Sequence, residues 1–288
     1  MKKVCQNCGS KIETSLKVPG LEGVFVCLEC EGWMASSSLS LAELSNQVYD
    51  ETYFNGKEYI NYQASDAVQR LNFRRKISLL DQYNFFSKDA RILEIGSATG
   101  LFLDELKKKD KSIQTMGIEI SQYARQIAEK KGHRVLTPES SELFEEIRKF
   151  NPTFICAWDV WEHLDSSVDT VTQYLNSSPE CQAVALTTVD VSAVIPKRKK
   201  KKWRQFHPPS HLNYPSRRSF VLFFKKYDYE VIFQKAYGMY RPLSEYLFAL
   251  CPILRSWLCR FKILYKIPIY MNLYDIQMVI AEKKNDHQ

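Results

Sequence analysis

The stretch RILEIGSATGLFLDELKKKDKSIQTMGIEIS, residues 91–121, predicts a buried strand, a tight turn, a helix and a second strand that ends in an acid. Residues 91–95 are mostly β-branched or leucyl, as in a parallel sheet that is covered on both faces. Gly96 and Gly100 bracket the turn, because glycine adopts positive φ and lets a ligand approach the backbone. Glu119 ends the second strand, where a carboxylate can accept hydrogen bonds from two ribose hydroxyls. This unit predicts an α/β fold that binds a nucleotide-like ligand.

The residues of the turn distinguish between two such ligands. A dinucleotide fingerprint has the pattern G-x-G-x-x-G, but Ala98 occupies the position of the middle glycine here. Glu94 would repel a pyrophosphate and attract a ligand that carries an ammonium and a sulfonium. The pattern therefore favours S-adenosylmethionine over NAD as the cofactor. The cofactor-binding residues expected in this stretch are Glu94, Gly96, Ser97, Ala98, Gly100, Glu119 and Ile120.

A second candidate group follows the fourth predicted strand, residues 153–158. Asp159, Glu162 and His163 would lie at the carboxyl end of this strand. Open parallel sheets bind ligands in a crevice outside these strand ends, so the group should face Glu94 and Glu119. His163 is the first candidate for a general base, since an imidazole accepts a proton near neutral pH.

Three features together resemble the class I S-adenosylmethionine-dependent methyltransferases. They are the E-x-G-x-x-x-G turn at residues 94–100, the acid Glu119, and the segment WDVWEHL at residues 158–164. The resemblance runs from about Tyr49 to the C-terminus, and it is greatest to the branch with a D-x-x-E-H segment, which includes ubiquinone-type and sugar-type methyltransferases. It implies a seven-stranded Rossmann-like sheet, methyl transfer from S-adenosylmethionine and a cofactor contact at Asp159. In many relatives the Glu-His pair is largely structural, which is the alternative role for His163.

The long segment 189–215 holds the other candidate histidines. WRQFHPPSHL, residues 203–212, resembles the loop of the same branch that closes over the acceptor, and His211 matches the family's histidine better than His207. The resemblance therefore makes His163 and His211 the catalytic candidates, and a metal site formed by His163, His207 and His211 is a further alternative.

A basic run, KRKKKKWR at residues 197–204, lies in the same segment. It allows three interpretations: a solvated loop, an anion-binding lid for a phosphorylated or nucleotide-linked acceptor, or a contact with nucleic acid or anionic lipid.

The cysteines fall into two groups. Cys5, Cys8, Cys27 and Cys30 form two C-x2-C pairs with the spacing of a zinc ribbon, so we expect a structural Zn²⁺ with four thiolate ligands. Metal binding would supply the folding energy that so short a segment lacks. Two redox pairs or disulfides are the alternative. The remaining cysteines are expected to be buried and inert, and they are Cys156, Cys181, Cys251 and Cys259.

These patterns divide the chain into three parts. Residues 1–35 form a zinc-ribbon-like segment, residues 36–90 an aromatic lid and a leading helix over 64–86, and residues 91–288 the methyltransferase domain. A helical insertion is expected at about 240–267. His133 is expected at the surface. The other expected elements are strands at 133–137, 181–188, 229–233 and 274–281, and helices at 122–131 and 216–227.

Composition limits the classes of protein that fit. The 288 residues suffice for one α/β core with a small appendage. The apolar run at 247–254 is shorter than the ~20 residues of a membrane-spanning helix, and the sequence shows no signal peptide, so a cytoplasmic location is expected. The net charge of +7 is concentrated in the basic run.

The function expected from the whole sequence is methyl transfer to a small molecule or a sugar or polysaccharide precursor. One alternative is an RNA or protein methyltransferase that docks through the ribbon and the basic run; another is a non-catalytic cofactor-binding module. The sequence leaves open the acceptor atom and the oligomeric state.

Overall fold

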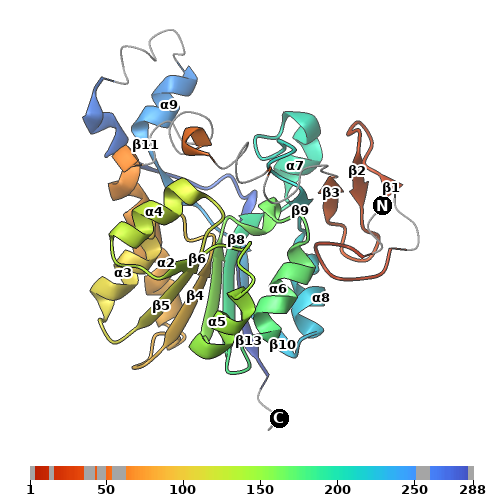
Figure 1. The fold of residues 1–288 in the computed structure, drawn as a ribbon. Helices are drawn as coiled ribbons and strands as arrows, with labels where there is room; N and C mark the ends of the chain where they lie inside the picture. Colours follow the sequence, from red (N-terminus) through yellow and green to blue (C-terminus); the bar gives the residue numbers. More distant parts are fainter. Residues whose placement is uncertain are drawn as a thin grey trace.

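The computed structural model describes residues 4–12, 16–35, 43, 50–53, 63–250 and 260–284, and the side chains of 248–250 lie outside the description (Figure 1). Its centre is a sheet with the strands β4 (Arg91–Ile95), β5 (Gln114–Ile118), β6 (Val135–Leu136), β7 (Phe154–Trp158), β8 (Ala183–Val189), β10 (Tyr229–Ala236) and β13 (Ile276–Lys283). These seven strands have the order β10-β13-β8-β7-β4-β5-β6. Strands β4, β5, β6, β7 and β8 are parallel to one another, and β13 is antiparallel to β8 and β10. The predicted seven-stranded α/β sheet is confirmed.

Helices cover both faces of this sheet. One face carries α2 (Asp66–Asp81), α3 (Leu101–Lys109) and α4 (Gln122–Lys130), and the other carries α5 (Leu143–Phe150), α6 (Ser167–Asn176) and α8 (Arg217–Lys225) (Figure 1). Every residue of β7 and β8 is buried, which explains why their sequences show no alternation of polar and apolar residues. Leu80 of α2 and Phe102 of α3 belong to the core of the first face, and Phe220 of α8 packs edge-to-face on Trp161 in the core of the second.

Capping residues mark three helix ends. The Ser121 hydroxyl accepts a hydrogen bond from Ala124 N, 3.4 Å away, and caps α4. Gly132 follows that helix with φ of +83°, a conformation that favours glycine. The Ser216 side chain caps α8 in a reciprocal arrangement with Ser219.

Several expected elements differ in length. The leading helix ends at Asp81 and is preceded by the 3-10 turn η3 (Gln63–Ser65), and the third parallel strand has only the two residues of β6. The predicted aromatic lid is described only at residues 50–53. The predicted boundary at 35–36 falls at the end of a described range. Cys251 and Cys259 lie outside the described residues.

The described residues of the insertion expected at 240–267 form both helix and strand. Strands β11 (Met239–Pro242) and β12 (Pro268–Met271) pair antiparallel at its base, and the helix α9 (Leu243–Leu250) and the 3-10 turn η7 (Lys262–Tyr265) lie between them. The strand pair was missed because each strand is short and contains proline. In the described part of the chain, no helix is long and apolar enough to cross a membrane.

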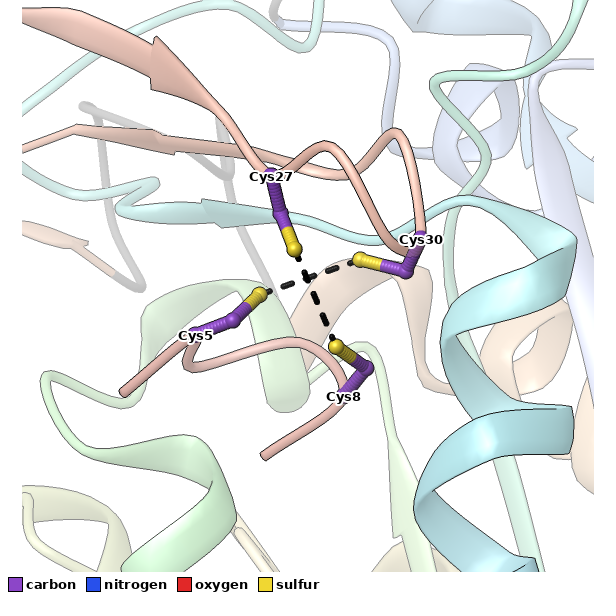
Figure 2. A group of neighbouring side chains, drawn as sticks. All are labelled: Cys5, Cys8, Cys27 and Cys30. Carbon is purple, nitrogen blue, oxygen red and sulfur yellow. Dashed lines mark hydrogen bonds between the residues drawn. The ribbon is translucent and has the colours of Figure 1, made fainter. Parts of the chain in front are cut away.

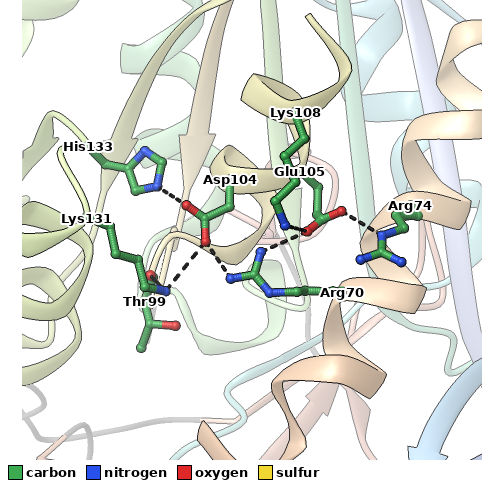
Figure 3. Close-up of polar contacts among 8 residues, drawn as sticks. All are labelled: Arg70, Arg74, Thr99, Asp104, Glu105, Lys108, Lys131 and His133. Carbon is green, nitrogen blue, oxygen red and sulfur yellow. Dashed lines mark hydrogen bonds and ion pairs between the residues drawn. The ribbon is translucent and has the colours of Figure 1, made fainter. Parts of the chain in front are cut away.

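His133 is buried, so the expectation that it lies at the surface was wrong. Its Nε2 lies 2.7 Å from Asp104 Oδ1 in a network that joins α2 to α3 (Figure 3). Arg70 donates to both Asp104 and Glu105, at 2.6 and 2.8 Å. Arg74 donates to the second oxygen of Glu105 at 2.6 Å. This network fixes the helix that follows the glycine turn against the helix that leads into the sheet.

The N-terminal segment forms a small sheet with a distant part of the chain. Strands β1 (Leu16–Lys17), β2 (Val24–Val26) and β3 (Trp33–Ala35) are followed in that sheet by β9 (Asn213–Tyr214). Strand β9 belongs to the segment 189–215, which also holds the short helix α7 (Val194–Lys199) and the 3-10 turn η5 (Lys200–Lys202). Trp33 packs in one apolar cluster with Trp203 and Tyr214. The segment was expected as a loop, but tertiary contacts of its buried tryptophan order it.

Candidate active site

A cavity of about 410 Å³ opens at the carboxyl ends of β4, β5 and β7. Most of the predicted site residues line it: Glu94, Gly96, Ser97, Ala98, Glu119, Ile120, Asp159 and His163. Gly100 and His211 are outside the lining. Gly100 begins α3 with φ of +77°, and a Cβ there would lie 2.6 Å from His133 Cδ2, so its lack of a side chain serves packing.

The turn after β4 brings backbone close to the cavity. Gly96 N and Ser97 N both donate to Ile118 O, at 2.8 and 3.0 Å, which ties the turn to the end of β5. Gly96 has φ of +70°, and a Cβ there would lie 2.4 Å from Val160 Cγ2. Ala98 also has positive φ, +44°, although it has a side chain. A non-glycine residue in this conformation is strained, and such strain is typical of functional sites.

Glu119 is oriented by the turn. Its carboxylate accepts hydrogen bonds from Ala98 N and Ser121 N, both at 2.8 Å. Burial raises the pKa of Glu119, and these hydrogen bonds oppose that shift. A carboxylate has about four acceptor positions, so two stay available for hydroxyl donors.

Glu94 is buried within β4 and has an unsatisfied oxygen. Its side chain lines the cavity, and Oε2 has no hydrogen-bond partner among the described residues. Burial raises the pKa of Glu94 well above its ordinary value, against the opposing charge of Lys76. An orphaned acceptor in a cavity wall suits a ligand that supplies a cationic donor.

Lys76 is a site residue that the sequence reasoning missed. Its Nζ lies 3.2 Å from Thr187 Oγ1, 4.0 Å from Asp159 Oδ2 and 4.6 Å from the ring centroid of Trp158. Its side chain is only 5% exposed, and burial lowers its pKa. A signal was present, because Lys76 interrupts the apolar stripe of α2 between Phe73 and Leu80. A buried cation at a cavity wall suits a ligand carboxylate.

His163 and His211 lie together, with ring centroids 4.5 Å apart. His163 Nδ1 is 2.7 Å from Ser210 O, and His211 Nδ1 is 2.8 Å from Gln205 O. Because a carbonyl only accepts, each Nδ1 carries the hydrogen, and each Nε2 carries a lone pair. Burial lowers the pKa of His163 to about 4 and that of His211 well below its ordinary value. Both imidazoles are therefore neutral proton acceptors at neutral pH.

Glu162 connects these histidines to the sheet. It is buried, and Thr188 of β8 donates to its Oε2 at 2.7 Å. Burial and the charge of Asp159 raise its pKa. Ligand-type atoms of Glu162, His163 and His211 lie within 4.8 Å of one another, close enough to bind one divalent cation. The ring centroid of His207 lies 3.8 Å from that of His211, with the two rings tilted, but His207 is not part of this group.

A scan against protein-family models matches residues 57–234 to the family described as "Methyltransferase domain". The chain belongs to this methyltransferase family. The match covers more than half of the sequence and includes the turn, the acid and all the histidines described above. No curated protein sequence is detectably similar to the chain.

A solved methyltransferase structure has a similar fold. The magnesium protoporphyrin IX methyltransferase of Synechocystis PCC 6803, solved with bound SAH, is 8% identical. Its TM-score is 0.52, and the match covers 84% of this chain and 97% of that one. A SAM-dependent methyltransferase from Archaeoglobus fulgidus is 15% identical, with a TM-score of 0.49 and coverage of 81% and 97%. At 8% identity, the likeness to the Synechocystis structure supports the fold alone.

Part of the cavity lining is apolar. Pro138, Leu143 and Phe144 contribute apolar side chains to it. Glu139 and Ser140, in the loop after β6, do not line the cavity. Tyr53, from the short described part of the aromatic segment at residues 50–53, also lines it.

The four N-terminal cysteines form a buried cluster (Figure 2). Cys5 Sγ lies 3.7 Å from Cys30 Sγ, and Cys8 Sγ lies 3.9 Å from Cys27 Sγ. A tetrahedron with Zn–S distances of about 2.3 Å has edges of about 3.8 Å, so these separations fit a zinc ion. All four thiols are free, in contrast to the disulfide alternative. Cys156 and Cys181 are also free and buried, as expected.

Proposed function

We propose that the protein is an S-adenosylmethionine-dependent methyltransferase that acts on a small molecule, such as a sugar or polysaccharide precursor. The observation that carries this proposal is the cavity in which Glu119, held by the glycine turn, lies together with the unsatisfied Glu94. Membership of the methyltransferase family supports the reaction class.

The cavity residues fit each part of the cofactor. Glu119 would accept hydrogen bonds from the ribose hydroxyls, and the apolar wall around Phe144 would contact the adenine. Glu94 would accept hydrogen bonds from the methionyl ammonium, and Lys76 would donate a hydrogen bond to the methionyl carboxylate. The bound cofactor would supply a methyl group on a sulfonium as the electrophile.

The protein's own residues would then position the acceptor and remove its proton. Methyl transfer is an in-line displacement, so most of the acceleration comes from orientation. His163 lines the cavity as a neutral imidazole whose Nε2 can take a proton from an acceptor hydroxyl or amine. His211 would help to hold the His163 ring in position, because it packs on that ring without lining the cavity.

The size of the cavity favours a small acceptor. Small-molecule sites in proteins have volumes of roughly 300–1,000 Å³. A cavity of about 410 Å³ has to hold the cofactor and the reacting part of the acceptor. We infer that the acceptor is of sugar or metabolite size.

We also infer that Zn²⁺ is the structural metal of the cysteine cluster. The location that we propose for the protein is the cytoplasm.

Transfer of a labelled methyl group tests the proposal. The protein would be incubated with methyl-labelled S-adenosylmethionine and a panel of nucleotide sugars, phosphorylated sugars and short RNAs. We expect label in a small acceptor. The transfer should fall about 100-fold or more in His163→Gln and stay unchanged in the exposed control Asp169→Ala. Label found only in RNA would contradict the small-acceptor proposal, and equal transfer by His163→Gln would remove His163 from the mechanism.

A further inference from the structure

The cysteine ribbon is connected to the cavity histidine through one short segment, residues 210–214. On one side of this segment, β3 pairs with β9 in the register Trp33 to Tyr214 and Met34 to Asn213. Ala35 N donates to Leu212 O at 2.7 Å. The last strand of the ribbon therefore holds the segment by its backbone.

The other side of the segment holds the loop that carries His163. Leu212 N donates to Glu162 O at 2.7 Å, and Ser210 O accepts the hydrogen of His163 Nδ1 at 2.7 Å. The Asn213 amide donates to Leu164 O and, at 2.8 Å, to Ser167 Oγ. The hydrogen bond that sets the tautomer of His163 thus comes from a carbonyl in the segment that the ribbon clamps.

The cysteine cluster itself contacts this arrangement. The Ser216 hydroxyl, just beyond β9, donates to Cys30 O. Met34 of β3 packs against the four cysteines, and its Sδ accepts a hydrogen bond from Gln6 N at 3.3 Å. A displacement of either cysteine pair would therefore reach β3 and Ser216 directly.

We propose that the ribbon is a positioning element for catalysis: through the pairing of β3 with β9, it holds the Ser210 carbonyl against His163 and so keeps Nε2 of His163 as the proton acceptor. This inference rests on the proposed function of His163 and goes beyond a merely structural role for the cysteine cluster. The ribbon makes none of the cavity lining, so it would act on the proton acceptor and leave cofactor affinity intact.

The test uses the full chain and a variant that cuts the clamp while keeping all four cysteines. Ala35→Pro, at the last residue of β3, removes the N–H that donates to Leu212 O. The control is Glu22→Ala, at an exposed position elsewhere in the ribbon. The readouts are the nitrogen-15 chemical shifts of the His163 ring, the zinc content, and the affinity for S-adenosylhomocysteine.

We expect wild type and Glu22→Ala to show His163 as the single Nδ1–H tautomer. Ala35→Pro, still zinc-loaded and binding S-adenosylhomocysteine within about twofold of wild type, should show averaged tautomers. An unchanged single tautomer in Ala35→Pro would overturn the proposal, and so would a loss of cofactor affinity in parallel, because the ribbon would then only stabilise the fold. If wild type failed to bind S-adenosylhomocysteine, the proposed function would fail, while the tautomer comparison would still report on the clamp.

Tyr214→Phe is a second, milder variant should Ala35→Pro fail to fold. It removes the hydroxyl that donates to His211 O at 2.9 Å and retains the ring in its apolar cluster. The proposal expects partial averaging of the His163 tautomers in this variant, and an unchanged spectrum would count against it.

Discussion

At the scale of single residues, Gly96 is the position where the site constrains the backbone most. Its positive φ and the 2.4 Å approach to Val160 each oppose a side chain. Gly132 has a similar φ of +83°, but no described atom lies within 4 Å of where its Cβ would be. A comparison of the two positions therefore separates the cost of backbone conformation from the cost of steric contact.

We expect Gly96→Ala to lower the free energy of unfolding by about 2–4 kcal/mol and Gly132→Ala by about 1–2 kcal/mol. Denaturant unfolding of both variants measures the difference. Equal losses would show that the contact with Val160 adds nothing and that the turn can move.

A second prediction concerns Lys76, whose replacement should affect cofactor binding and stability differently. A buried cation with its nearest carboxylate oxygen 4.0 Å away is not fully compensated. Lys76→Met should therefore leave the thermal midpoint unchanged or raise it, while weakening S-adenosylhomocysteine binding about 10- to 100-fold. Lys225→Met, at an exposed position of α8, is the control. A Lys76→Met protein that is less stable but binds normally would contradict the role given to Lys76.

At the scale of elements, the contact between α2 and α3 predicts a pH dependence of stability. Arg74, Lys108 and Arg70 oppose the effect of burial and lower the pKa of Glu105 from 4.5 to about 2. A carboxyl whose pKa is lower in the folded state stabilises the fold above its unfolded pKa. That stability is lost as the pH falls from about 4.5 to about 2.

Unfolding free energies measured across this pH range test the assignment. The decline with falling pH should be shallower in Glu105→Gln than in wild type. Glu145→Gln, at an exposed position of α5, should leave the wild-type slope unchanged. Parallel slopes for wild type and Glu105→Gln would mean that other carboxyl groups control acid unfolding.

At the scale of the whole molecule, the basic run separates the small-acceptor proposal from an RNA methyltransferase. Among the described residues, the cations from 197 to 202 form no ion pair with a carboxylate. If the acceptor is small, binding to a labelled RNA should be non-specific, with a Kd of roughly 10⁻⁶ M or weaker at physiological salt. Fluorescence anisotropy at low and physiological salt measures this. Tight, sequence-dependent binding at physiological salt would favour the RNA alternative.

Much of this architecture could be predicted because local patterns agreed with the tertiary structure. Residues 91–95, Gly96 and Glu119 each carry a signal that depends on neighbours in sequence, and strand order then brings them together. Lys76, His133 and the β3–β9 pair depend on partners more than 25 residues away, at Thr187, Asp104 and the ribbon. Local periodicity contains no information about such partners. For the same reason, the tautomers of His163 and His211, which the carbonyls of Ser210 and Gln205 determine, could not be predicted from the sequence.

The most direct measurement is calorimetric titration of the zinc-loaded protein with S-adenosylhomocysteine, compared with Glu119→Ala and the exposed control Glu230→Ala. Saturable binding to wild type and Glu230→Ala is expected. Glu119→Ala should bind about 10- to 100-fold more weakly, because it loses charge-assisted hydrogen bonds to the ribose. A folded wild-type protein without detectable binding, or a Glu119→Ala protein that binds as well as wild type, would contradict the account of this cavity as a cofactor site.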